Sequence, residues 1–159
     1  MRYFFDVEDG YFLEIGGYDP IIISLSHPLL TQGWHGITVE ANPETAKNFY
    51  EQRPKEQNIN AAAGVEDEMV KLYINKIPGR STISKDVKEE KDLPKQPFIK
   101  EVMVPGLSMK EICERYFMKK VDFFTLDVEG VGGMVLESND WSNPLCVPDF
   151  IIVEDNKLN

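Results

Sequence analysis

The chain has 159 residues, 42% of them hydrophobic and 28% charged, as in one soluble globular domain with a buried core. Its formal net charge of −10, without a cluster of Lys and Arg, argues against a protein that binds nucleic acid through its phosphates. No apolar run approaches the roughly 20 residues that cross a bilayer, so we expect no membrane association.

The first sixty residues alternate between strand and helix signals. A strand is predicted at 11–15, directly before the glycine pair at 16–17, and a helix is predicted over 21–32. A second strand, at 37–40, leads into a helix over 42–53, which begins with an N-cap asparagine and a proline.

The second half continues this alternation. Strands are predicted at 59–64, 69–74, 99–104, 121–126 and 150–153, the last of them buried. Helices are predicted over 108–116, where Ser108 and Glu111 form a capping box, and over 134–137. Alternating strands and helices build a mostly parallel sheet with helices on its faces, so the sequence predicts an α/β protein with one domain over residues 1–159.

Residues 76–100 interrupt this pattern. The stretch 77–84 is rich in turn-forming residues, and 85–95 mixes Lys with Asp and Glu. A long irregular segment of this kind is either a solvated surface loop or a mobile lid over a site. The hydroxyl groups of Ser81 and Thr82 could bind a substrate, or they could serve ordinary turns.

Two cysteines, Cys113 and Cys146, are too few for a disulfide framework and lack the spacing of metal ligands. We therefore expect both to be small buried hydrophobic residues in a reducing compartment, and we assign no metal site. Near the start, Asp6 precedes any apolar signal-peptide region, so the expected location is cytoplasmic.

The glycine pair and the end of the second strand form the clearest motif. Gly16 and Gly17 place no Cβ where a ligand would approach the backbone. Glu40, at the tip of its strand, is placed to accept both hydroxyl groups of a ribose. The turn lacks the G-x-G-x-x-G spacing that holds a pyrophosphate, and Asp19 would repel phosphate, which argues against a nicotinamide dinucleotide.

Six segments together resemble one family. They are Phe12–Gly16, Gly33–Pro43, Asn60–Gly64, Ser81–Ser84, Val121–Gly130 and Phe150–Glu154. In this order they resemble the FkbM-like methyltransferases, and the most specific parts are Gly33–Pro43 and Leu126–Gly130. The resemblance extends over roughly residues 11–154, nearly the whole chain. It implies a Rossmann-like class I methyltransferase sheet and S-adenosylmethionine as the methyl donor.

The resemblance also implies roles at the cofactor site. Gly16 and Gly17 would approach the amino-acid portion of S-adenosylmethionine, with Glu14 beneath the turn. Glu40 would accept the ribose hydroxyls, since two carboxylate oxygens suit a vicinal diol. The small Ala62 would leave room for the flat adenine ring.

Methyl transfer to oxygen needs aligned reactants and a general base. Asp127, at the carboxyl end of its strand, is the first choice, and it would meet the cofactor's ammonium group, orient the acceptor hydroxyl, or do both. Glu129 and His35 are the other base candidates. Each has a structural alternative: Asp127 as a helix cap, Glu129 as a partner of turn amides, and His35 as a surface or packing histidine.

Two features depart from the family pattern. Gly132 stands where the family usually has an acidic residue, and with Gly133 it weakens a helix start by roughly 1 kcal/mol per glycine. The chain also stops soon after Glu154, so we expect the C-terminal edge strands to be absent and a sheet edge to be open. A second copy of the chain or another protein could cover that edge.

The sequence therefore predicts an S-adenosylmethionine-dependent methyltransferase that methylates oxygen on a small hydroxylated molecule or a sugar of a glycan. The alternative is a non-catalytic module that keeps the methyltransferase fold for protein interaction, which Gly132, Gly133 and the short C-terminus favour. Cofactor binding without methyl transfer would distinguish the second from the first.

Overall fold

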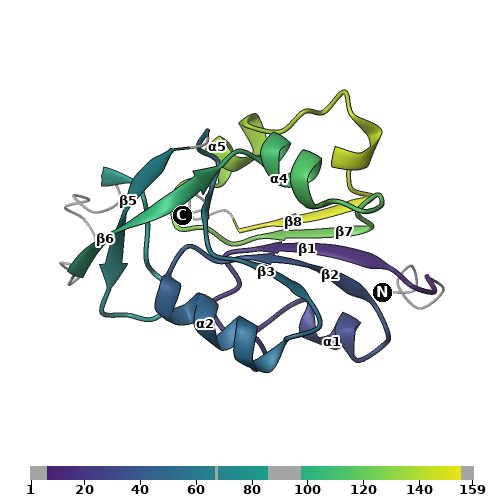
Figure 1. Cartoon of the computed structure of the whole chain (residues 1–159), viewed down its shortest axis with the longest axis horizontal. Helices are drawn as coiled ribbons and strands as arrows, with labels where there is room; N and C mark the ends of the chain where they lie inside the picture. Colours follow the sequence, from purple (N-terminus) through teal and green to yellow (C-terminus); the bar gives the residue numbers. More distant parts are fainter. Residues whose placement is uncertain (1–6, 67, 86–97, 155–159) are drawn as a thin grey trace.

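Five parallel strands form the central sheet of the computed structural model, which describes residues 7–66, 68–85 and 98–154. They run in the order β3-β2-β1-β7-β8 (Figure 1). Their bounds are β1 Tyr11–Ile15, β2 His35–Val39, β3 Gln57–Ile59, β7 Phe123–Leu126 and β8 Phe150–Val153. All four neighbouring pairs are parallel, which confirms the predicted α/β class and the Rossmann-like arrangement.

A smaller sheet stands beside the first, in the order β4-β6-β5. It consists of β4 (Ala62–Ala63), β5 (Met69–Asn75) and β6 (Phe98–Leu107). β5 and β6 are antiparallel, and Figure 1 shows them at the end of the central sheet toward which β1 runs. The carboxyl ends of the parallel strands therefore face the smaller sheet.

Helices cover both faces of the central sheet (Figure 1): α1 (His27–Leu30) and α2 (Pro43–Gln52) one face, α4 (Met109–Tyr116) and α5 (Gly132–Glu137) the other. Leu13 and Ile15 of β1 pack in the same buried cluster as Ile112 of α4. The Phe12 side chain points to the opposite face of the sheet from Leu13 and packs with Leu29 of α1. The period-2 alternation of β1 thus supplies both layers of the core.

Two helices begin as the sequence predicted. The Asn42 side chain accepts a hydrogen bond from the Glu44 backbone N–H at the start of α2. At the start of α4, Ser108 and Glu111 form the expected capping box. These side chains satisfy N–H groups that have no partner within the helix.

The predicted helix over 21–32 is wrong in its first half, because only α1 is helical. The Asp19 carboxylate accepts hydrogen bonds from the backbone N–H groups two and three residues farther on. The Ser24 hydroxyl turns inward and donates to Glu14. Such local side-chain bonds compete with helix formation, and they leave Ile22 85% exposed.

The cysteine prediction is also wrong. Cys113 and Cys146 are both buried, but they form a disulfide between α4 and the short 3₁₀ helix η1 (Pro144–Cys146). Their separation of 33 residues gives no local sign of contact, which arises only when the fold brings the two elements together. Disulfides persist mainly in oxidising compartments, and the cytoplasmic location expected from the sequence stays a prediction.

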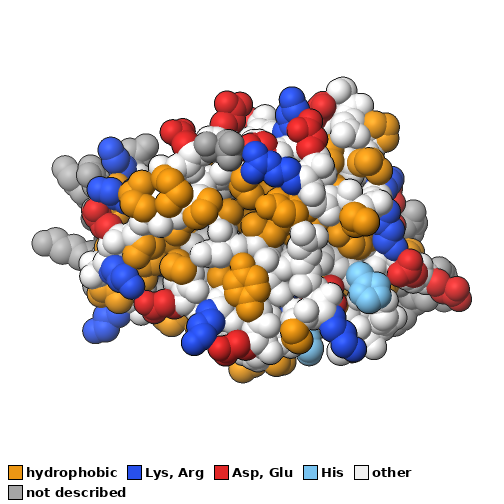
Figure 2. Space-filling model, in the orientation of Figure 1, with side chains coloured by type: hydrophobic (Ala, Val, Ile, Leu, Met, Phe, Trp, Pro, Cys, Tyr) orange, Lys and Arg blue, Asp and Glu red, His pale blue; other side chains and the backbone are white. Residues whose placement is uncertain are grey.

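β8 forms the edge of the described sheet and is not buried as predicted. Its four apolar residues, Phe150–Val153, are each 37–48% exposed. Figure 2 shows one face of the molecule, on which hydrophobic side chains lie among charged groups of both signs. An exposed apolar edge strand invites pairing with another chain, but a partner at this edge stays a prediction.

Among the helices of the described residues, none combines the length and apolar character needed to cross a bilayer.

Candidate active site

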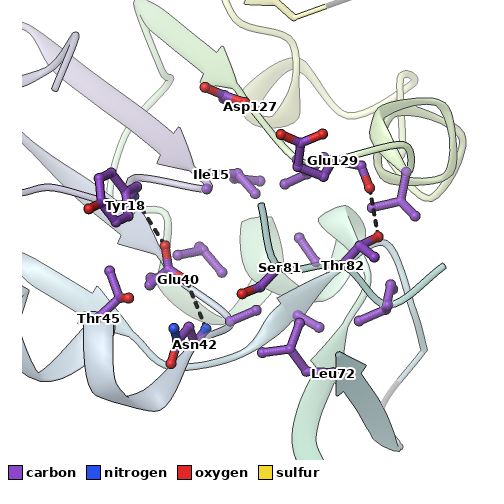
Figure 3. Close-up of a pocket in the computed structure, with 18 of the residues that line it drawn as sticks. Ile15, Tyr18, Glu40, Asn42, Thr45, Leu72, Ser81, Thr82, Asp127 and Glu129 are labelled. Atoms are coloured by element: carbon purple, nitrogen blue, oxygen red, sulfur yellow. Dashed lines mark hydrogen bonds between the residues drawn. The ribbon is translucent and has the colours of Figure 1, made fainter. Parts of the chain in front are cut away.

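A pocket lies where the carboxyl ends of the parallel strands meet the smaller sheet (Figure 3). Ligands gather at this end of parallel sheets. The polar and small residues in its wall include Gly16, Tyr18, Glu40, Asn42, Ala62, Ser81, Thr82, Asp127 and Glu129. Residues from at least four separate segments of the chain therefore converge on one pocket.

Gly16 brings the turn after β1 against the end of β7. Its φ is +82°, and a Cβ there would lie 1.7 Å from the carbonyl oxygen of Asp127. Its N–H donates to the Val39 carbonyl at 2.9 Å. Gly17 faces the other way, since a Cβ there would lie 2.7 Å from the Phe49 ring of α2. Packing therefore requires both glycines, and Gly16 is the one in the pocket wall.

Glu40 follows β2, and its carboxylate is held at both oxygens. Oε2 accepts from the Tyr18 N–H at 3.1 Å and Oε1 from the Asn42 N–H at 2.7 Å (Figure 3). Burial raises the pKa of Glu40 to about 7, although these backbone hydrogen bonds favour the ionised form. The backbone thus fixes the orientation of a carboxyl group that titrates near neutral pH.

Asp127 and Glu129 lie on the side of the pocket opposite Glu40 (Figure 3). Partial burial, followed by a hydrogen bond and charge repulsion from Glu154, raises the pKa of Asp127 to about 7. Partial burial and the charge of Glu154 also raise the pKa of Glu129, while Arg80 acts in the opposite direction. A carboxyl group with a pKa near neutrality suits a general base.

The described part of the predicted lid runs along this pocket. Thr82 is buried, and its hydroxyl donates to the Glu129 carbonyl at 2.7 Å (Figure 3). The Thr82 backbone also pairs with Tyr73 of β5. Ser81, beside it, lies in the pocket wall. Residues 86–97 of the predicted segment lie outside the described residues, and closure of a lid stays a prediction.

Besides Gly17, two residues predicted for the site are not in the pocket wall. Glu14 is buried behind the turn, where it forms an ion pair of 3.1 Å with Arg53 and accepts from the Ser26 hydroxyl at 2.6 Å. His35 is the first residue of β2, at the opposite end of that strand from Glu40, with its side chain 61% exposed and 3.8 Å from Glu56. The structure therefore separates His35 from the two carboxyl groups at the pocket.

Other residues of the pocket wall were not predicted from the sequence. Tyr18 has an unusual positive φ of 26°, and a Cβ on Gly79 would lie 3.6 Å from its ring. Its place directly after the glycine pair is a local signal that could have indicated it. Thr45 and Leu72 also line the pocket, but they come from α2 and β5. No local pattern marks those two, since only the fold brings them there.

Comparison with models of protein families gives a match. A family model described as the methyltransferase FkbM domain matches residues 14–159. Searches among curated proteins and among solved structures found nothing that matches the chain.

Proposed function

Because the chain belongs to the FkbM methyltransferase family, we propose that it binds S-adenosylmethionine in this pocket and transfers the methyl group to an acceptor oxygen. One observation carries the proposal: Glu40 and Asp127 line the same pocket, at the carboxyl ends of the strands. Backbone N–H groups hold the Glu40 carboxylate in place, where it could accept hydrogen bonds from a ribose. The acceptor is a small hydroxylated molecule or a sugar, by analogy with the family.

The pocket offers a place for each part of the cofactor. The Glu40 carboxylate would accept the ribose hydroxyls with the lone pairs that Tyr18 and Asn42 leave free. Ala62, with its neighbours Ala61 and Ala63, gives a wall of small side chains that suits the adenine. The carboxylate of Asp127 would attract the ammonium group of the amino-acid portion.

The cofactor supplies a methyl group on a positively charged sulfur, which makes the methyl carbon electrophilic. The protein must align the acceptor oxygen with that carbon and remove the hydroxyl proton. Asp127 or Glu129 would accept this proton as the new carbon–oxygen bond forms and the carbon–sulfur bond breaks. We do not assign His35 to this step, since it lies at the far end of β2.

Calorimetric titration with S-adenosylmethionine, S-adenosylhomocysteine and NAD tests the binding step. We expect saturable binding of the first two and none of NAD, because the turn after β1 lacks the glycine spacing for a pyrophosphate. Binding of NAD alone, or of none of the three, would contradict the proposal.

The second candidate is a non-catalytic interaction module, favoured by Gly132 and Gly133. Helix α5 does begin at Gly132, but its N-cap, Val131, has no side-chain cap hydrogen bond. A panel of sugar and small hydroxylated acceptors with labelled methyl donor separates the two functions. Methyl transfer that disappears in Asp127→Asn supports the enzyme, whereas cofactor binding without transfer to any acceptor supports the module.

A further inference from the structure

Glu154 has no role in the function proposed above, yet it adjoins Asp127. β7 and β8 pair in parallel with Leu126 opposite Val153, and the Glu154 N–H donates to the Leu126 carbonyl at 3.0 Å. Asp127 and Glu154 are thus the next pair across the two strands, and the neighbouring Glu154 helps to raise the pKa of Asp127. Two ionised carboxylates side by side repel each other, so Glu154 favours a proton on Asp127.

We propose that Glu154 is a positioning residue of the active site, which faces Asp127 across the ends of β7 and β8 and so controls the orientation and charge of Asp127. This inference rests on the proposed function in one respect: Asp127 must bind the cofactor or take the proton of the acceptor hydroxyl.

The surroundings of Asp127 explain why a proton is kept there. Three carboxyl groups act on it: Glu154 from β8, Glu129 from its own loop and Glu14 from β1. The positive charge of Arg80 acts on Glu129, where it lowers the pKa. When like charges gather in a partly buried place, a carboxyl group there holds its proton to a higher pH than usual.

A proton held by Asp127 has a consequence for binding. A cationic group that approaches Asp127, such as the ammonium group of the proposed cofactor, favours the ionised form of this carboxyl group. The proton is then released to the buffer, so cofactor binding near neutral pH should release protons from Asp127. Glu154 would thereby couple cofactor binding to pH.

The first test needs no cofactor. The side-chain carboxyl ¹³C signal of Asp127 is followed by NMR as the pH is raised, in the wild type, Glu154→Gln and Glu129→Gln. In Glu154→Gln, the glutamine keeps the shape of Glu154 and can donate a hydrogen bond to an ionised Asp127. The midpoint of the Asp127 titration should therefore fall by about one pH unit or more. Glu129→Gln should lower it less, because the charge of Glu129 contributes less to the raised pKa of Asp127 than Glu154 does.

Glu137→Gln is the matched control, because Glu137 is exposed on α5 and outside the pocket wall. It should leave the midpoint of Asp127 unchanged. An unchanged midpoint in Glu154→Gln, or a larger change in Glu129→Gln, would overturn the proposal.

The second test separates the inference from the proposed function. S-adenosylhomocysteine is titrated calorimetrically in two buffers of different ionisation enthalpy, which gives the number of protons released. Glu154→Gln should release fewer protons than the wild type at a pH of about 7. Equal release in both would count against the role of Glu154, whereas absence of binding would count against the proposed function and leave the NMR titration to decide the inference.

Discussion

Glu40 is a second residue, besides Asp127, through which pH should act on cofactor affinity. Its ionised form can accept from both ribose hydroxyls, and burial raises its pKa to about 7. The affinity for S-adenosylhomocysteine should therefore fall by up to about tenfold per pH unit below pH 7, as the carboxylate becomes protonated. Calorimetric titrations between about pH 5.5 and 8 measure this dependence.

The variant Glu40→Gln isolates this effect. We expect affinity about 10- to 100-fold weaker than wild type at neutral pH, since hydrogen bonds to a charged group are lost. We also expect the part of the pH dependence that belongs to Glu40 to disappear. Glu44→Gln, a neighbouring exposed carboxylate on α2, serves as the control and should bind as the wild type does. Wild-type affinity in Glu40→Gln would remove the ribose assignment.

Gly16 should not tolerate a side chain, whereas Gly33, which has a similar backbone conformation, should tolerate one. Both Gly16 and Gly33 have positive φ, +82° and +86°. A Cβ on Gly16 would meet backbone atoms of Asp127, but a Cβ on Gly33 would meet nothing within 4 Å. Gly33→Ala should cost about 1 kcal/mol of backbone strain, and Gly16→Ala about 3 kcal/mol or more.

Denaturant unfolding of the two alanine variants measures the difference. The comparison distinguishes strain in φ, which both share, from the close approach of the turn to β7, which only Gly16 has. Equal losses of unfolding free energy would show that the close approach does not matter.

At the scale of elements, the disulfide between α4 and η1 should stabilise the fold. The bond closes a loop between residues 33 apart, and closing a loop of this size typically contributes about 2–4 kcal/mol by restricting the unfolded chain. The oxidised protein should therefore unfold at higher denaturant concentration than the reduced protein. The double variant Cys113→Ala/Cys146→Ala should be less stable than the oxidised wild type and insensitive to reductant. Equal stability of oxidised and reduced protein would contradict this prediction.

Local patterns were enough to predict most elements. The caps of α2 and α4 lie within a few residues of the N–H groups that they satisfy, so the sequence contains the whole interaction. Strands β1, β2 and β7 and the carboxylates that follow two of them could likewise be predicted, because strand ends in parallel sheets face a common edge.

The errors concern long-range partners. The helix over 21–32 failed because Ser24 and Ser26 bind Glu14, whose partner Arg53 lies 39 residues farther on. The same network explains why Glu14 is behind the turn and absent from the pocket wall. The disulfide, the exposed edge position of β8 and the contribution of Thr45 to the pocket likewise depend on which elements meet in space.

At the scale of the whole molecule, the pocket joins two sheets. Its wall takes Glu40 and Asp127 from the ends of the central sheet, and Leu72 and Ala62 from the smaller one. In the described residues the Thr82 hydroxyl already connects these two parts through the Glu129 carbonyl. A ligand that contacts both would stabilise the native state in proportion to its affinity, by about 2.7 kcal/mol at a concentration 100 times its Kd.

The pocket carboxyls should also govern the pH dependence of stability in the cofactor-free protein. The pKa values of Glu40 and Asp127 are raised from 4.5 and 3.8 to about 7, mainly by burial. Between about pH 4.5 and 7 the folded state therefore binds more protons than the unfolded state. Their contribution to stability is fully present below the ordinary pKa values and is lost as the pH rises through about 7.

The thermal midpoint should accordingly be higher at about pH 5.5 than at about pH 8, measured at constant ionic strength. The net charge of −10 works in the same direction, because protonation of carboxylates reduces self-repulsion. Glu40→Gln separates the two causes: it removes the buried titrating group and changes the net charge by only one. Its midpoint should change less with pH than that of the wild type. If the thermal midpoint of the wild type instead rises from pH 5.5 to pH 8, ionisation of these carboxyl groups does not destabilise the folded state, which would contradict the prediction.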